Sequence, residues 1–152
     1  MVRIALTTLV ALLIAAPLAS AARPVAYTGK TSGGSSITLK RSGSQVKALR
    51  TVVSTVCVET TGSGQTRAGS ELYRPPGVLT LGKQRKVKAL QPAAMNSGTK
   101  ATKHYTVKVR DSGPKLKGKL RLSFSFLRLD LFRTLPYTFI CTGTAKFTAK
   151  PR

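Results

Sequence analysis

Residues 115–126 read KLKGKLRLSFSF, and their side chains alternate between two kinds with a period of two. One set is cationic and then small and polar: Lys115, Lys117, Lys119, Arg121, Ser123 and Ser125. The set between them is apolar, with one glycine: Leu116, Gly118, Leu120, Leu122, Phe124 and Phe126. Side chains of a strand point alternately to its two faces, so the segment predicts a strand with one face in the core and a cationic face in solvent.

The same alternation recurs along the chain and indicates the fold class. Besides 116–126, it predicts strands at 27–30, 37–40, 46–58, 71–74, 78–81, 85–90, 105–110 and 137–148. Turns at 32–36, 42–44 and 111–114 join antiparallel neighbours, whereas 60–70 and 91–102 have the composition of loops. The prediction is an all-β fold, an antiparallel β-sandwich or small barrel of about eight strands.

The long strand predicted at 46–58 has an ambiguous phase. Ala48-Leu49 and Val52-Val53 interrupt strict alternation. A β-bulge or burial of both faces would explain the interruption.

The first 21 residues predict a secretory signal peptide. Arg3 supplies a positive start, residues 4–16 are apolar apart from two threonines, and 19–21 (ASA) form a small-x-small cleavage signature. The alternative is a membrane anchor, but the apolar run is shorter than the roughly 20 residues of a spanning helix, and no stop-transfer cluster follows. We therefore expect residues 22–152 to form a single secreted β domain without a transmembrane segment.

Charge is the most unusual property of the composition. Without Arg3, 25 Lys and Arg side chains remain against 4 Asp and Glu, a net charge of +21. Such a charge opposes compaction and favours anionic partners such as nucleic acid, envelope polymers and acidic lipid headgroups. The alternative is that lysines on strands protect sheet edges and keep a secreted domain soluble.

The two cysteines, Cys57 and Cys141, are expected to form a disulfide, because an exported chain folds in an oxidising compartment. Cys141 shares the apolar phase of its strand with Phe139 and Phe147, and Cys57 lies in the long central strand. The bond would pass through the core and tie an early strand to the last one. The alternative is two buried thiols.

The inventory of catalytic side chains is poor: Glu59, Glu71, Asp111 and Asp130 are the carboxylates, and His104 is the only histidine. Glu59 and Glu71 flank the loop predicted at 60–70 and could approach each other, but isolated counter-charges on a basic surface are the simpler interpretation. No Gly-x-Ser-x-Gly motif or cluster of metal ligands accompanies His104, which we expect to be exposed on its strand. We predict a protein that is not an enzyme and uses no cofactor or metal.

Binding has more support than catalysis. The candidate anion-binding residues share the polar phases of two neighbouring predicted strands: Lys108, Arg110, Lys115, Lys117, Lys119 and Arg121. Lys146 and Lys150 lie on the polar phase of the last strand, and a second basic cluster lies at 82–90. If the strands pair with these faces together, a broad cationic surface forms for anionic polymers or an acidic lipid surface. The aromatic residues of the closing strands fall on apolar phases and Trp is absent, so sequence-specific nucleic-acid binding is not expected.

Four segments together resemble a known pattern: YTGKTSGGSSITLKRSG at 27–43, TVVSTVCVET at 51–60, KLKGKLRLSFS at 115–125 and CTGTAKFTAK at 141–150. After a signal peptide, this layout resembles small exported β-rich proteins of unknown function from high-GC Gram-positive bacteria. The resemblance covers most of 27–150 and implies export, one β domain and a Cys57–Cys141 pair. It supplies no functional residues.

These observations favour one function over two alternatives. We expect a secreted, non-enzymatic protein, extracellular or associated with the cell envelope, that binds anionic polymers electrostatically or has a structural role there. The first alternative is a membrane-active or inhibitory cationic factor, for which 127–135 is the one segment able to expose an apolar face. The second is a hydrolase built from His104 or two of the carboxylates. The sequence does not indicate an oligomeric state.

Overall fold

The computed structural model describes residues 23–94, 99–128 and 136–152, and these form a nearly all-β protein. Nine strands follow one another along the chain: β1 Val25–Thr31, β2 Ser36–Ser42, β3 Gln45–Glu59, β4 Thr66–Tyr73, β5 Leu79–Thr80, β6 Gln84–Pro92, β7 Lys100–Ser112, β8 Lys115–Arg128 and β9 Tyr137–Pro151. The described residues contain no α-helix, and the named strands pair antiparallel. The all-β antiparallel prediction is confirmed. The signal peptide predicted at 1–21 lies outside the described residues.

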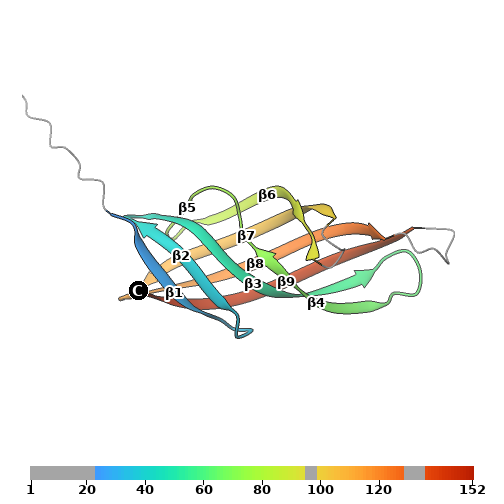
Figure 1. The fold of residues 1–152 in the computed structure, drawn as a ribbon, viewed down its shortest axis with the longest axis horizontal. Coiled ribbons are helices and arrows are strands. Elements are labelled where there is room, and N and C mark those ends of the chain that lie inside the picture. Colours follow the sequence, from blue (N-terminus) through green and yellow to red (C-terminus); the bar gives the residue numbers. More distant parts are fainter. Residues whose placement is uncertain (1–22, 95–98, 129–135) are drawn as a thin grey trace, which may run out of the picture.

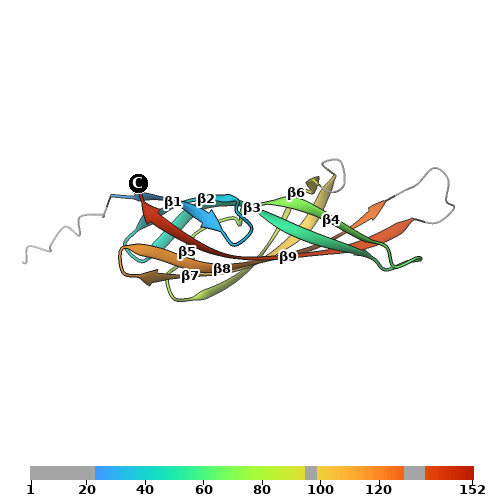
Figure 2. The same cartoon turned by 90° about the horizontal axis from the view of Figure 1, so that it is seen from below.

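The strands form one sheet that is coiled on itself. Its order is β4-β3-β2-β1-β9-β8-β7-β6, β5 pairs with β3, and β3 also pairs with β9. The length of β9 allows this arrangement, because its C-terminal half pairs with β1 and its N-terminal half with the end of β3. The result is an elongated body in which β1, β2 and β3 lie opposite β7 and β8 (Figures 1 and 2). The first described strand and the C-terminus lie together at one end (Figure 1).

The interior is built from the apolar phase of each strand. Leu116, Leu120 and Leu122 of β8 are fully buried, while the basic side chains that alternate with them on the opposite face are exposed or half-buried. These three leucines belong to one continuous cluster of buried side chains, which includes Ile37 of β2 and Val53 of β3 from the opposite layer. Each large apolar side chain buried in this way contributes roughly 1.5–3 kcal/mol. The alternation predicted from residues 115–126 is therefore the alternation between core and surface.

Two glycines allow strands to pack closely at points where a side chain would clash. A Cβ at Gly118 would lie 2.3 Å from the ring of Phe147, and a Cβ at Gly143 would lie 2.6 Å from the carbonyl oxygen of Ser54. Phe147 can fill the space beside β8 only because Gly118 leaves it empty. Gly143 similarly lets β3 approach β9 just before the two strands begin to pair.

A β-bulge resolves the ambiguous phase of the long strand. Thr38 is paired with Arg50 and Lys40 with Lys47, so Ala48 and Leu49 together lie opposite Leu39 of β2. Ala48 has a φ of 51°, in the left-handed region that only glycine adopts without strain. After the bulge, burial alternates strictly to the end of β3. Of the two explanations considered, the bulge is confirmed.

Two loops are shorter than predicted because pairing extends strands of weak propensity into them. The predicted loop at 60–70 is already strand from Thr66 onward, since Thr66 to Tyr73 pair with β3 from Val58 back to Thr51. The predicted loop at 91–102 is strand at both ends, since β6 and β7 stay paired out to Pro92 and Lys100. The turn after β7 is also tighter than predicted, because Ser112 still pairs with Lys115.

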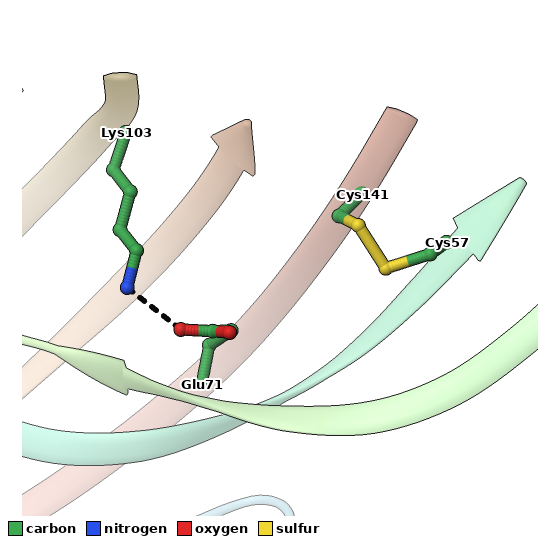
Figure 3. Close-up of a disulfide and its surroundings, with 4 residues drawn as sticks. All are labelled: Cys57, Glu71, Lys103 and Cys141. Atoms are coloured by element: carbon green, nitrogen blue, oxygen red, sulfur yellow. Dashed lines mark hydrogen bonds and ion pairs between the residues drawn. A yellow bond between two sulfur atoms is a disulfide. The ribbon is translucent and has the colours of Figure 1, made fainter. Parts of the chain in front are cut away.

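The predicted disulfide is confirmed, and it lies in the core and ties an early strand to the last one, as expected. Cys57 and Cys141 are bonded, fully buried and directly opposite each other in neighbouring strands β3 and β9. The bond therefore joins two strands side by side on the inner face of the sheet and does not cross between the layers (Figure 3). Within the described residues, no helix is long and apolar enough to cross a membrane.

Candidate anion-binding surface

The outward side chains of β6, β7, β8 and β9 form one cationic surface. These strands are neighbours in the sheet, and their polar phases point to the same side. We call this surface the cationic face and define it by Lys86, Lys88, Lys108, Arg110, Lys117, Lys119, Arg121 and Lys146, all of which are exposed. The sequence predicts a broad cationic surface if these strands pair with their polar faces on one side, and they do.

A row of three lysines crosses the middle of this face. Lys108 of β7 is paired with Lys119 of β8, and Lys119 is paired with Lys146 of β9. Arg110 and Lys117 form the next pair along the same two strands. Directly opposite side chains on a sheet have Cβ atoms about 4.5–5.5 Å apart, and like charges at that distance destabilise the fold. The fold therefore keeps these lysines side by side although their mutual repulsion lowers its stability.

The cationic face is hollowed. A hollow of about 650 Å³ lies over β6, β7 and β8, and it is lined by Gln84, Lys86, Val87, Lys88, His104, Tyr105, Thr106, Lys108, Lys119, Leu120, Arg121 and Ser123. A second hollow of about 410 Å³ adjoins it over β7, β8 and β9, and it shares Lys108 and Lys119 with the first. No carboxylate is among the residues that line either hollow. A curved surface lined by charge of one sign concentrates its field and raises the local concentration of counter-ions.

The six candidate residues fall into two groups. Lys108, Arg110, Lys117, Lys119 and Arg121 all lie on the cationic face and line one or both hollows. Lys115 is half-buried at the tip of the β7–β8 hairpin, paired with Ser112, and lines neither hollow.

Three residues of the face were not among the six candidates. Lys86 and Lys88 of β6 join it because they are paired with Thr106 and His104 of β7. Lys146 joins it by its pairing with Lys119. Lys146 could be placed on this face from the polar phase of the last strand. Lys86 and Lys88 could not, because only the strand order of the sheet shows that β6 lies beside β7.

The described carboxylates are held away from this surface. Asp111 forms an ion pair with Arg41 of β2. Glu59 and Glu71 are both buried, so their interpretation as counter-charges on the surface is wrong. Glu71 is paired with Val53, six residues before Glu59 on β3, which separates the two by roughly 20 Å at the rise of a strand. They therefore do not flank a common bond as a pair of glycosidase carboxylates would.

A buried ion pair lies beneath the hollowed face. Nζ of Lys103, on β7, is 2.6 Å from a carboxylate oxygen of Glu71, on β4, and both side chains are almost completely buried (Figure 3). Lys103 lies between the loop predicted at 91–102 and the strand predicted at 105–110. It shares the apolar phase of Tyr105 and Val107, but a lysine at such a position is not expected to be buried. The pair joins the two layers, because β4 and β7 are far apart in the order of the sheet.

Two tyrosines complete this interior cluster. The rings of Tyr73 and Tyr105 meet edge to face at 5.0 Å between centroids, and the Tyr73 hydroxyl donates to the carbonyl of Thr106 at 2.9 Å. Burial raises the pKa of the Tyr105 hydroxyl to about 12, with a smaller contribution from the nearby Glu71 carboxylate. Burial also raises the pKa of Tyr73. Both hydroxyls are therefore neutral over the physiological range.

Aromatic side chains are not displayed on the cationic face for stacking. Among the described residues, the tyrosines and phenylalanines are buried, apart from Phe126, which is partly buried against the core. His104 is exposed on β7, as predicted, and lines the larger hollow. The described residues hold no group of three or more His, Cys, Asp or Glu that could bind a metal ion. The face offers charge and hydrogen-bond donors rather than ring surfaces.

No protein-family model matches the sequence, and no curated protein matches it significantly.

Proposed function

We propose that this is a secreted, non-enzymatic protein that binds anionic polymers of the cell envelope or the extracellular space through its cationic face. The observation that carries the proposal is the row Lys108–Lys119–Lys146, placed across three strands between two adjoining hollows without a lining carboxylate. Like charges in direct opposition weaken a sheet, and an anionic ligand would remove that repulsion. Binding would thus be driven by charge neutralisation and by the release of the polymer's counter-ions.

The ligand class follows from what the face offers. Ammonium and guanidinium groups bind phosphate, sulfate and carboxylate oxygens, and Arg110 and Arg121 can do so with two parallel hydrogen bonds. Base stacking is not supported, because the described aromatic side chains belong to the interior. The expected recognition is of the charged backbone of a linear polymer, without sequence specificity.

The expected location outside the cell rests on three observations. The first 21 residues have the layout of a signal peptide, the cysteines form a disulfide, and the segments quoted above resemble exported proteins. The membrane-active alternative depended on residues 127–135, of which 129–135 lie outside the described residues. An acidic lipid surface therefore enters as one arm of the test.

The test compares two triple variants with equal loss of charge. K108Q/K119Q/K146Q removes the central row, and K40Q/K47Q/R50Q removes three exposed cations from the outer side of β2 and β3. Lys40 and Lys47 are also directly opposed, but none of these three residues lines either hollow, so the control tests the hollowed site and not opposition alone. Binding to single-stranded DNA, polyphosphate, polyglutamate and anionic vesicles would be measured against salt concentration. For single-stranded DNA, the slope of log K against log salt is expected to fall in magnitude by about 2 in the row variant, since each neutralised phosphate contributes about 0.7. The control variant should lose much less.

Equal losses in the two variants would contradict the proposal, because binding would then follow net charge and not a site. Binding of wild type to vesicles alone would favour the membrane-active alternative. Wild type that binds none of the four probes at low salt would exclude the cationic face as a binding surface.

A further inference from the structure

The outer face of the sheet changes character halfway along its strands. On β8 the outward side chains run Lys117, Lys119 and Arg121 and then Ser123, Ser125 and Leu127. On β9 they run back from Lys146 to Thr142 and Ile140. From this point the face continues onto β3 and β4, because β9 pairs with the second half of β3 and β3 with β4.

This second region is the uncharged face. We define it by the outward residues of the part where four strands lie side by side: Thr66 and Ala68 of β4; Val56 and Val58 of β3; Thr138, Ile140 and Thr142 of β9; and Ser123, Ser125 and Leu127 of β8. None of these residues carries a charge, in a chain of net charge +22.

The uncharged face exposes a cluster of aliphatic side chains. Val56 is 47% exposed at its centre, with Ala68 on one neighbouring strand and Thr142 on the other. Val58 and Ile140 are a directly opposed pair, 43% and 48% exposed. Contiguous aliphatic patches on a protein surface often mark interaction sites.

We propose that the uncharged face binds a second copy of this chain, forming a weak two-fold dimer. The charge distribution decides which face of the chain can make this contact. Contacts between copies through the cationic face would place cations against cations, whereas contacts through the uncharged face involve no like charges. An acidic partner would be drawn to the cationic face instead. With the strands of the two copies antiparallel, the cationic halves extend from opposite ends of the dimer and do not face each other.

The composition and size of the face set the expected affinity. Valine, isoleucine, serine and threonine suit the packing of one sheet on another, and the face has no aromatic residue of the kind that anchors proteins at membrane surfaces. Strands about 4.8 Å apart and a two-residue repeat of about 6.7 Å give an area of roughly 320 Å² per copy. Interfaces of that size are weak and transient, so we expect a dissociation constant of about 10 µM or higher.

Salt separates this association from ligand binding. Added salt screens the repulsion between two strongly basic copies, so dimerisation should strengthen as salt increases. Polymer binding should weaken under the same change. The opposite signs make the two proposals testable on one protein, and either one can fail without the other.

Sedimentation velocity of the oxidised protein from about 10 µM to 1 mM, at low and high salt, tests the proposal. We expect reversible dimers that increase with concentration and with salt. Val56→Lys should raise the dissociation constant at least tenfold, because it places two new charges in the interface. Val25→Lys is the matched control, since Val25 is 45% exposed on β1, and it should leave the dimer largely intact. Val56→Thr, which keeps the side-chain shape, should give an intermediate weakening and guards against misfolding of the lysine variant.

A monomer at every concentration and salt would overturn the proposal, as would equal weakening by Val25→Lys and Val56→Lys. Binding of wild type but not Val56→Lys to uncharged lipid vesicles would show that lipid, not a second copy, occupies the face, and would also overturn it.

Discussion

The cationic face and the uncharged face are two halves of one continuous sheet surface, built on the same strands β8 and β9. In the first half, Lys119 and Lys146 are directly opposed, and in the second, Ser125 and Ile140 occupy an equivalent pair. The strand pairing and the core beneath continue across both halves. Backbone structure therefore does not produce the difference, which lies entirely in the outward side chains.

The contrast indicates how a domain of this charge can hold two kinds of surface. Lysines scattered evenly would keep the chain soluble and protect it from aggregation. Concentrating cations in one half leaves the other half neutral, and this raises the repulsion in the first while exposing aliphatic groups in the second. The repulsion lowers stability and the exposed aliphatic groups lower solubility. A bound partner on each half would offset both effects.

The largest expected effect concerns the disulfide, which lies on the inner side of the uncharged half. Replacing both Cys57 and Cys141 by alanine removes a crosslink with a sequence separation of 84. The chain-entropy estimate for such a loop is about 4–5 kcal/mol, a loss comparable with the whole stability of many small domains. Denaturant unfolding of wild type and the double variant would measure the loss. A loss below about 1 kcal/mol would show that pairing of β3 with β9 does not depend on the bond.

The next effect concerns the ion pair that joins the layers beneath both halves. Lys103→Met leaves the carboxylate of Glu71 buried without its lysine, and this should cost roughly 3–5 kcal/mol. Combining it with Glu71→Leu removes both charges and should recover most of that loss. The free energies of unfolding of the two variants decide the point. Equal instability of the single and double variants would indicate that the pair matters for its packing and not for its charge.

A smaller effect, of opposite sign, separates the two halves. Removing the lysine row in K108Q/K119Q/K146Q should raise stability at low salt by up to about 1 kcal/mol, because directly opposed like charges are relieved. Replacing Ser123 and Ser125 by glutamine in the uncharged half provides no such relief and should not stabilise. Thermal unfolding at low and high salt measures this, and the gain should shrink as salt screens the charges. A destabilised row variant would mean that these lysines support the fold.

The smallest effect is spectroscopic and tests the shared interior. The pKa of Tyr105 is raised from 10.0 to about 12 in the folded protein. Unfolded chains therefore lose this proton first, so the contribution of Tyr105 to stability is complete below about pH 10 and is lost as the pH rises towards 12. Tyrosinate absorbance should show Tyr105 titrating late, by comparison of wild type with Tyr105→Phe. Titration of Tyr105 near pH 10 in the folded protein would contradict its burial.

The sequence predicts the strands well because the signal is local. In residues 115–126 each side chain reports its own face by its chemistry, and Leu116 and Lys117 lie where the alternation places them. The change from cationic to uncharged outward side chains is also visible in this segment, because the outward positions switch from Arg121 to Ser123. A second local signal, the doubled Ala48-Leu49, marks the bulge.

What could not be predicted depends on contacts between distant strands. Thr66–Ser70 is strand because β3 offers pairing partners, and its own composition resembles a loop. The lysine row requires the register of three strands, which local periodicity does not specify. Lys103 shares the buried phase of β7, but it can be buried only because Glu71 of a distant strand neutralises it, and the local sequence does not identify that partner.

Amide chemical shifts of the isotope-labelled protein, titrated with a short single-stranded DNA oligomer at low salt, test the central claim most directly. The claim is that anions bind at the cationic face and not wherever the charge is high. We expect the largest shifts at Lys86, Lys108, Lys119 and Lys146, with little change at Lys40, Lys47 and Arg50 or at Val56, Val58 and Ile140 of the uncharged face. Shifts spread equally over the lysines of β2, β3, β7 and β8 would contradict it, because the polymer would then surround the protein as a diffuse counter-ion.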